Sequence, residues 1–153
     1  MIQTENIPVK KEEEIADLLC ELTRLCNIKE EHLASTFNLS PGEFRLLKCF
    51  VSKESYTTKE LCYLLNLTPG RITHLVSSLE KKNLIKRYVT PIDRRNIIIS
   101  LSSASRNFIN SIYADHVNFH NNVLIKVTEK KKREILSSLK MLVDSLQKWI
   151  NEK

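Results

Sequence analysis

A pair of short, separately capped helical segments, followed at once by residues with a strand period, limits the fold of this chain more than any other feature. Thr57-Thr58-Lys59-Glu60 has capping-box spacing, in which a Thr oxygen and a Glu carboxylate each accept a hydrogen bond from the other's backbone amide. Thr68-Pro69 then begins a second helix, because proline fits the first helical position. Helices over Thr58–Leu65 and Pro69–Lys82, joined by a tight connection, form a predicted helix-turn-helix.

Apolar spacing defines the inward face of both helices. The inward positions predicted for the first helix are Leu61, Leu64 and Leu65, and those for the second, at i, i+3, i+4 and i+7, are Ile72, Leu75, Val76 and Leu79. Asn83 ends the second helix, because asparagine tolerates the left-handed conformation that helix ends often adopt. Each helix thus has one face for a core and one for solvent or a partner.

The hydrophobic period then changes from 3.6 to 2 residues. Ile85–Val89 alternates apolar and polar residues, Pro91–Arg94 is typical of a turn, and Asn96–Leu101 is rich in β-branched residues. These segments predict an antiparallel hairpin, which is the only sheet that we expect. A helix-turn-helix followed directly by such a hairpin has the element order of a winged helix.

Further helices flank this part of the chain on both sides. A single apolar stripe runs from Ile15 to Cys26, and the next helix opens at a Ser40–Glu43 capping box and should end near Ser52–Ser55. Helical spacing returns over residues 102–126 and again over 128–150. With only 2 glycines and 4 prolines in 153 residues, glycine-rich phosphate loops and β-sandwiches are disfavoured. The predicted fold is mainly α with one β-hairpin.

The polar face of the second helix of the pair combines small hydrogen-bonding groups with long cations. With the capping threonine, it consists of Thr68, Arg71, His74, Ser77, Ser78 and Lys81. Arginine can contact guanine O6 and N7 in bidentate fashion, and serine, threonine and histidine offer smaller donors to base edges or phosphates. A formal net charge of +6 also favours an anionic partner. We therefore predict that this face enters the major groove of double-stranded DNA.

The hairpin adds a second cationic group. Arg94 and Arg95 stand beside Asp93 at its tip, where the carboxylate could hold one guanidinium while the other enters the electronegative minor groove. Arg87, on the first strand, is a candidate contact to the DNA backbone. The hairpin is thus predicted to act as a DNA-binding wing.

These residues carry a resemblance to a known family. The run Asp93-Arg94-Arg95-Asn96-Ile97-Ile98-Ile99-Ser100-Leu101-Ser102 resembles the D-x-R…L-[ST] signature of the MarR (multiple-antibiotic-resistance regulator) family of winged helix-turn-helix proteins. Leu79-Glu80-Lys81-Lys82-Asn83-Leu84-Ile85 is similar to the end of that family's recognition helix, except that Asn83 stands where glycine is common. The flanking long helices resemble the family's dimerisation elements, so that the likeness covers most of the chain.

The resemblance implies an obligate homodimer that binds a pseudopalindromic operator, with Asp93 and Arg95 at the family's wing positions. The apolar pattern agrees, because the first helix and the last two expose more apolar stripe than one small winged domain can cover. We therefore expect a DNA-binding lobe over residues 39–101 and a helical dimerisation region over residues 1–38 and 102–153.

Together these features predict a cytoplasmic, sequence-specific regulator of transcription, with repression as the expected sense. No run of about 18 apolar residues could span a membrane, and the N-terminus lacks the apolar core of a secretory signal. The sequence carries no recognisable catalytic motif or cofactor fingerprint, so we expect neither enzymatic activity nor a cofactor. Two alternatives stay open: a non-specific, architectural DNA-binding protein, and a winged helix that contacts protein or RNA.

Two pairs of residues are candidate sensors of an effector of unknown identity, either a small molecule or an oxidant. His116 and His120 have the i, i+4 spacing of shared metal ligands, but no Cys, Asp or Glu stands at a companion spacing in that helix, so we favour packing over a metal site. Cys20 and Cys26 lie in the first helix, where members of the resembled family sense oxidants. For these thiols, too, buried packing is the favoured interpretation.

Overall fold

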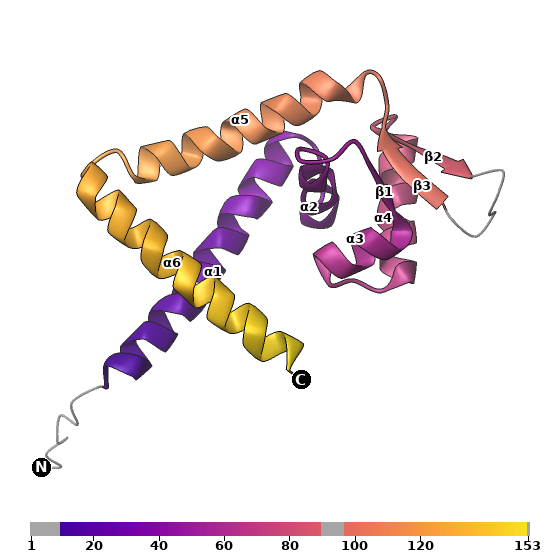
Figure 1. The fold of residues 1–153 in the computed structure, drawn as a ribbon. Helices are drawn as coiled ribbons and strands as arrows, with labels where there is room; N and C mark the ends of the chain where they lie inside the picture. The colour runs from indigo at the N-terminus through magenta and orange to yellow at the C-terminus, as the bar shows by residue number, and fades with distance from the viewer. Residues whose placement is uncertain (1–9, 90–96, 153) are drawn as a thin grey trace, which may run out of the picture. The chain divides into compact units, whose positions relative to one another are not determined.

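A computed structural model describes residues 10–89 and 97–152, and within them the chain forms six helices and three short strands (Figure 1). In chain order these are α1 (Lys11–Thr36), α2 (Pro41–Cys49), β1 (Ser55–Thr57), α3 (Thr58–Leu65), α4 (Pro69–Lys81), β2 (Ile85–Val89), β3 (Ile97–Leu101), α5 (Ser105–Val123) and α6 (Glu129–Asn151). The chain divides into two compact units between Tyr113 and Ala114. Within the described ranges, no helix is both long and apolar enough to cross a membrane.

Side-chain caps begin α2, α3 and α4 where the sequence predicted them. At α2, the Ser40 hydroxyl accepts from the Glu43 amide at 3.3 Å, and a Glu43 carboxylate oxygen accepts from the Ser40 amide at 2.7 Å. Thr57 and Glu60 form the same reciprocal box at α3, and Thr68 caps α4 ahead of its first residue, a proline. These caps satisfy amides that a helix start otherwise leaves unpaired, so they fix the residue at which each helix begins.

Several predicted details of the helices are corrected by the structure. α2 ends at Cys49, short of the predicted end near Ser52–Ser55, because the chain turns there to enter β1. Leu64 is 53% exposed and not inward, because α3 is a two-turn helix that buries only its Leu61 face. α1 continues to Thr36, well beyond the apolar stripe from which it was predicted.

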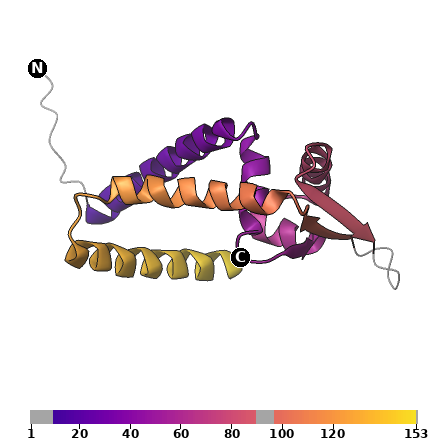
Figure 2. The ribbon, with the colours of Figure 1, turned by 90° about the horizontal axis from the view of Figure 1, so that it is seen from above.

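The sheet contains the predicted hairpin and, in addition, a third short strand that the sequence did not indicate. β2 and β3 lie side by side as the predicted hairpin (Figures 1 and 2). Arg87 of β2 lies opposite Ile99, and β1 pairs antiparallel with the other edge of β3, with Tyr56 opposite Ile99. The strand order is therefore β1-β3-β2. Ser55–Thr57 escaped prediction because three residues are too few to show an alternating pattern.

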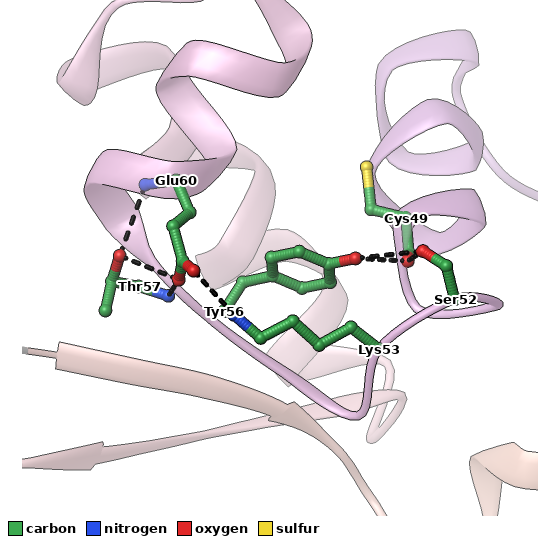
Figure 3. Close-up of polar contacts among 6 residues, drawn as sticks. All are labelled: Cys49, Ser52, Lys53, Tyr56, Thr57 and Glu60. Carbon is green, nitrogen blue, oxygen red and sulfur yellow. Dashed lines mark hydrogen bonds and ion pairs between the residues drawn. The ribbon is translucent and has the colours of Figure 1, made fainter.

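The turn between α2 and α3 is held by side-chain contacts (Figure 3). The hydroxyl of Tyr56, a buried residue, donates to the Cys49 carbonyl at 2.7 Å and lies 3.2 Å from the Ser52 hydroxyl. Lys53 pairs with Glu60, whose pKa is lowered to about 2, first by this hydrogen bond and then by those from the Thr57 amide and hydroxyl. The contacts join the end of α2 to β1 and to the start of α3, which places the helix-turn-helix against the sheet.

One core unites the lobe. Its largest fully buried side chains come from α2 and its C-cap, α3, α4, the sheet and the first half of α5: Phe44, Leu46, Leu47, Phe50, Leu61, Ile72, Val76, Leu79, Ile85, Ile99, Ile109 and Ile112. All four predicted inward residues of α4 are at most 2% exposed. The predicted stripe of the helix-turn-helix is therefore confirmed for α4, and it is what orients this helix against the rest of the lobe.

Apolar side chains of the outer helices are left exposed. In α1, five of them are between 47% and 62% exposed: Ile15, Leu18, Leu22, Leu25 and Ile28. In α6, which has no buried residue, eight are between 40% and 64% exposed: Ile135, Leu136, Leu139, Met141, Val143, Leu146, Trp149 and Ile150. Both helices thus carry apolar side chains that are exposed in the single chain, as the sequence predicts.

Candidate nucleic-acid interface

α4 separates a buried apolar stripe from an exposed polar face. Thr68 caps the helix by accepting from the Arg71 amide at 3.3 Å. Arg71, His74 and Lys81 are exposed, and Ser77 is partly exposed. Their positions opposite the buried stripe follow from the helical period, because residues three, four and seven apart share a face. The structure therefore brings these predicted contacts together on one side of α4.

Ser78 is placed differently from the other predicted contacts of α4. It is partly buried, and its hydroxyl donates to Glu43 Oε1 at 2.6 Å, across to the start of α2. Its hydrogen-bonding group is thus turned toward the body of the lobe. The sequence showed only that Ser78 lies off the apolar stripe of α4, and a bond between residues 35 positions apart leaves no local signal.

Glu43 is the buried carboxylate at the centre of this contact. Besides Ser78, its carboxylate accepts from the Ser40 amide at 2.7 Å and from Lys82 Nζ at 2.9 Å. Burial favours a higher pKa for Glu43, but the hydrogen bonds from Ser78, Ser40 and Lys82, together with the charge of Lys82, outweigh it and lower the pKa to about 2. Sequence reasoning identified Glu43 only as a capping residue and missed its contact with α4.

The wing is joined to the opposite flank of α4. Arg87 Nε, in β2, donates to Glu80 Oε2 at 3.0 Å, and a second guanidinium nitrogen contacts the same oxygen. This hydrogen bond is the main cause of a lowered pKa at Glu80. The predicted wing-tip residues Asp93, Arg94 and Arg95 lie outside the described residues.

A hollow lies beside the start of α4. It has a volume of about 280 Å³ and is bordered by the first turn of α2, including Gly42, and by Arg45, Leu67 and Arg71. Arg45 also pairs with Glu30 of α1. Arginine side chains therefore border a concave surface next to the exposed polar face of α4.

The candidate sensor residues occupy the outer helices. The rings of His116 and His120 lie edge to face, with centroids 4.8 Å apart. Across residues 10–89 and 97–152, no group of three or more His, Cys, Asp or Glu is arranged to hold a metal ion. Cys20 and Cys26 are exposed in the single chain, so no other part of this chain supplies the packing that was predicted for the two thiols.

The sequence of the helix-turn-helix and of the strands after it is similar to that of known proteins. Residues 39–97 match the model of the MarR family. The chain is 31% identical over 78 residues to the HTH-type transcriptional regulator MhqR of Bacillus subtilis, an alignment that takes in 51% of this chain and 54% of that protein. The match therefore spans about half the length of that relative.

Solved structures show the same fold. A MarR transcriptional regulator from Methanosarcina mazei superposes with a TM-score of 0.78 at 17% identity, covering 89% of this chain and 98% of its own. FabT of Streptococcus pneumoniae, solved in complex with DNA, gives 0.77 at 19% identity, covering 90% and 98%. With its capped helix-turn-helix and its three-stranded sheet, the chain has the winged-helix fold of these regulators, and its residues 39–97 match the MarR family.

Proposed function

We propose that this chain is a sequence-specific regulator of transcription that binds double-stranded DNA as a homodimer. The construction of α4 carries the proposal: a fully buried stripe holds the helix against the lobe, while Arg71, His74 and Lys81 stand on its exposed side. A helix of this kind, in a helix-turn-helix followed by a wing, fits the major groove. Its role is binding and not catalysis.

The exposed residues of α4 take different parts in this proposal. Arg71, in the first turn, is suited to a bidentate contact with guanine, and His74 and Ser77 to smaller base or phosphate contacts. Lys81, in the last turn, is a phosphate contact, and Thr68 lies at the start of the helix, where a phosphate can meet unpaired amides. Base contacts specify the sequence, and phosphate contacts fix the register of the protein on the duplex.

The hairpin supplies the second part of the proposed interface. Arg87, held beside the end of α4 by Glu80, is suited to a backbone contact. Arg94 and Arg95 are proposed to reach the minor groove with Asp93 orienting a guanidinium, a role supported by the sequence resemblance. Contacts from both helix and wing would explain why these elements occur together in one lobe.

The proposed homodimer rests on the open apolar stripe of α1 and on that of α6. The stripe of α1 alone contains five large side chains at about half exposure, far more than scattered surface residues require. A two-fold partner would bury it, which assigns residues 1–38 and 102–153 to dimerisation and residues 39–101 to DNA binding. Two recognition helices related by a two-fold axis read half-sites about one helical turn apart.

Regulation would follow from the spacing of the two recognition helices. A small molecule, or oxidation of Cys20 or Cys26, could favour one spacing over another and so release the operator. We propose that the protein represses transcription by occupying promoter DNA. Only an effector that distinguishes the two spacings can shift the balance between them.

Selection of bound duplexes from a random pool by the purified full chain tests the function. We expect enrichment of an inverted repeat whose half-sites lie about 10 base pairs apart. The enriched duplex should bind at least about 10³ times more tightly than a scrambled duplex at the same salt concentration. Equal, steeply salt-dependent binding to every duplex would instead establish an architectural protein, and absence of binding at low salt would point to a protein partner.

A further inference from the structure

We infer that Glu43 is a positioning residue for α4: through Ser78 and Lys82, its buried carboxylate sets the orientation in which the helix presents Arg71 and His74 to DNA. The inference rests on the proposed function and names residues that control its specificity from outside the interface. It also gives Ser78 a different part from the base or phosphate contact that its sequence position suggested.

The geometry separates Glu43 from the DNA-facing surface. Only 3% of this residue is exposed, so that it cannot itself touch a duplex. Its two partners, Ser78 in α4 and Lys82 at the C-cap of that helix, are spaced i, i+4 and so lie on the same flank, one turn apart. Two attachments one turn apart restrain both the rotation of α4 about its axis and its distance from α2.

The same network ties α4 to the segment that precedes α2. Lys82 Nζ, at the end of α4, donates to the Asn38 carbonyl at 2.9 Å as well as to Glu43. The Glu43 carboxylate is in turn held by the Ser40 amide. One buried anion therefore connects the start of α2, the connection before it and the last turns of α4.

The negative charge of the Glu43 carboxylate strengthens the hydrogen bonds that attach α4 to α2. The pKa of Glu43 is lowered to about 2, because the hydrogen bonds and the Lys82 charge outweigh the effect of burial. The carboxylate is thus ionised at neutral pH, and its bonds are charge-assisted, which makes them shorter and about twice as strong as neutral ones. Loss of one bond should leave the helix in place, held by its buried stripe, but free to tilt.

The contrast between a positioning role and a direct contact defines the experiment. Binding of the full chain to the selected inverted-repeat duplex and to a scrambled duplex is measured for the wild type, Ser78→Ala, Glu43→Gln and the double variant. Ser78→Thr keeps the hydroxyl and should restore wild-type behaviour. Glu60→Gln is the matched control, because Glu60 occupies the same capping-box position in α3 and bonds to Thr57 and Lys53, not to α4.

We expect Ser78→Ala and Glu43→Gln each to lower the ratio of specific to scrambled affinity by about tenfold, the size of effect that loss of a hydrogen bond to a charged group gives. Affinity for scrambled DNA and its salt dependence should not change, because neither variant removes a cation. The double variant should lose no more than Glu43→Gln alone, since the Ser78 bond is one of the two attachments that Glu43→Gln already weakens. The preference for the selected base should decline at every position of the half-site.

Other outcomes would overturn the inference. Independent, multiplicative losses in the double variant, or a loss confined to one base pair in Ser78→Ala, would make Ser78 a direct contact. An equal loss in Glu60→Gln would show a general effect of helix capping. If Glu43→Gln fails to fold, amide hydrogen exchange of α4 still decides: it should be faster in Ser78→Ala than in Ser78→Thr, and equal rates contradict the inference. A wild type that binds both duplexes equally would contradict the proposed function itself.

Discussion

α4 and α6 are both amphipathic helices with an apolar stripe at helical spacing, yet the chain buries one stripe and leaves the other open. The inward residues of α4 are at most 2% exposed, whereas no residue of α6 is buried. The difference lies in the neighbours, since α2, α3 and the sheet cover α4 within one lobe. The stripe of α4 therefore completes a core inside one chain, whereas the similar stripe of α6 is available to pack against another surface.

The largest contrast should come from shortening one leucine in each stripe. Leu79→Ala in α4 is expected to lower the free energy of unfolding by about 2–5 kcal/mol, because a fully buried side chain leaves a cavity. Leu139→Ala in α6 is the matched change at a residue that is 42% exposed in the single chain. Urea unfolding at several protein concentrations separates the two cases.

For Leu79→Ala, the loss should be the same at every protein concentration, because the core belongs to one chain. For Leu139→Ala, it should shrink as the protein is diluted and disappear where both proteins are monomeric, since the interface stabilises only the dimer. A concentration-independent loss of several kcal/mol at Leu139 would place its stripe in the core of a single chain and remove the distinction between α4 and α6.

A charge placed in the stripe of α1 tests whether a second copy covers it. Leu18→Asp should weaken dimerisation by about 3 kcal/mol or more, because an unpaired carboxylate would be buried in the interface. Sedimentation at micromolar concentration should then show monomer. Thr23→Asp, which adds the same charge on another face of α1, is the control and should remain dimeric. A dimer that survives Leu18→Asp would exclude this stripe from the interface.

Acid should loosen α4 through Glu43. The folded pKa of Glu43, about 2, lies below its ordinary value of 4.5, so its stabilisation is complete above pH 4.5 and is lost as the pH falls through 2. Over that range the wild type should lose up to about 3 kcal/mol more unfolding free energy than Glu43→Gln. Unfolding curves at a series of pH values measure the difference. Parallel pH profiles for the two proteins would show that the Glu43 carboxylate adds no stability.

The smallest expected effect concerns specificity alone. Arg71→Ala should cost about 1–3 kcal/mol of discrimination at one position of the half-site and leave folding unchanged, because the side chain is exposed. Affinities for operator duplexes with single base changes measure it. A uniform loss on every duplex, with a shallower salt dependence, would make Arg71 a phosphate contact.

Local sequence signals predicted α4 well and its surroundings less well. The cap at Thr68, the four inward residues and the left-handed Asn83, at φ 58°, are all determined within a few residues of sequence, and the structure confirms them. β1 was missed because a three-residue strand shows no period. The exposure of Leu64 was missed because spacing alone cannot tell how much of a short helix is covered.

In the candidate site, too, the local sequence predicts some features, and others depend on tertiary structure. The exposure of Arg71 and Lys81 follows from the helical period, because both lie away from the buried stripe. The bond between Ser78 and Glu43 joins two helices that are remote in sequence, so that only tertiary structure reveals it. The exposure of Cys20 and Cys26 likewise depends on what covers α1, which the sequence of one helix does not specify.

Titration of the full chain with the selected inverted repeat and with a scrambled duplex, at about 150 mM salt, tests the account most directly. It predicts two chains per duplex and an affinity ratio of at least about 10³ in favour of the selected sequence. One chain per duplex, or equal affinity for both sequences, would contradict a dimer that reads its operator through α4.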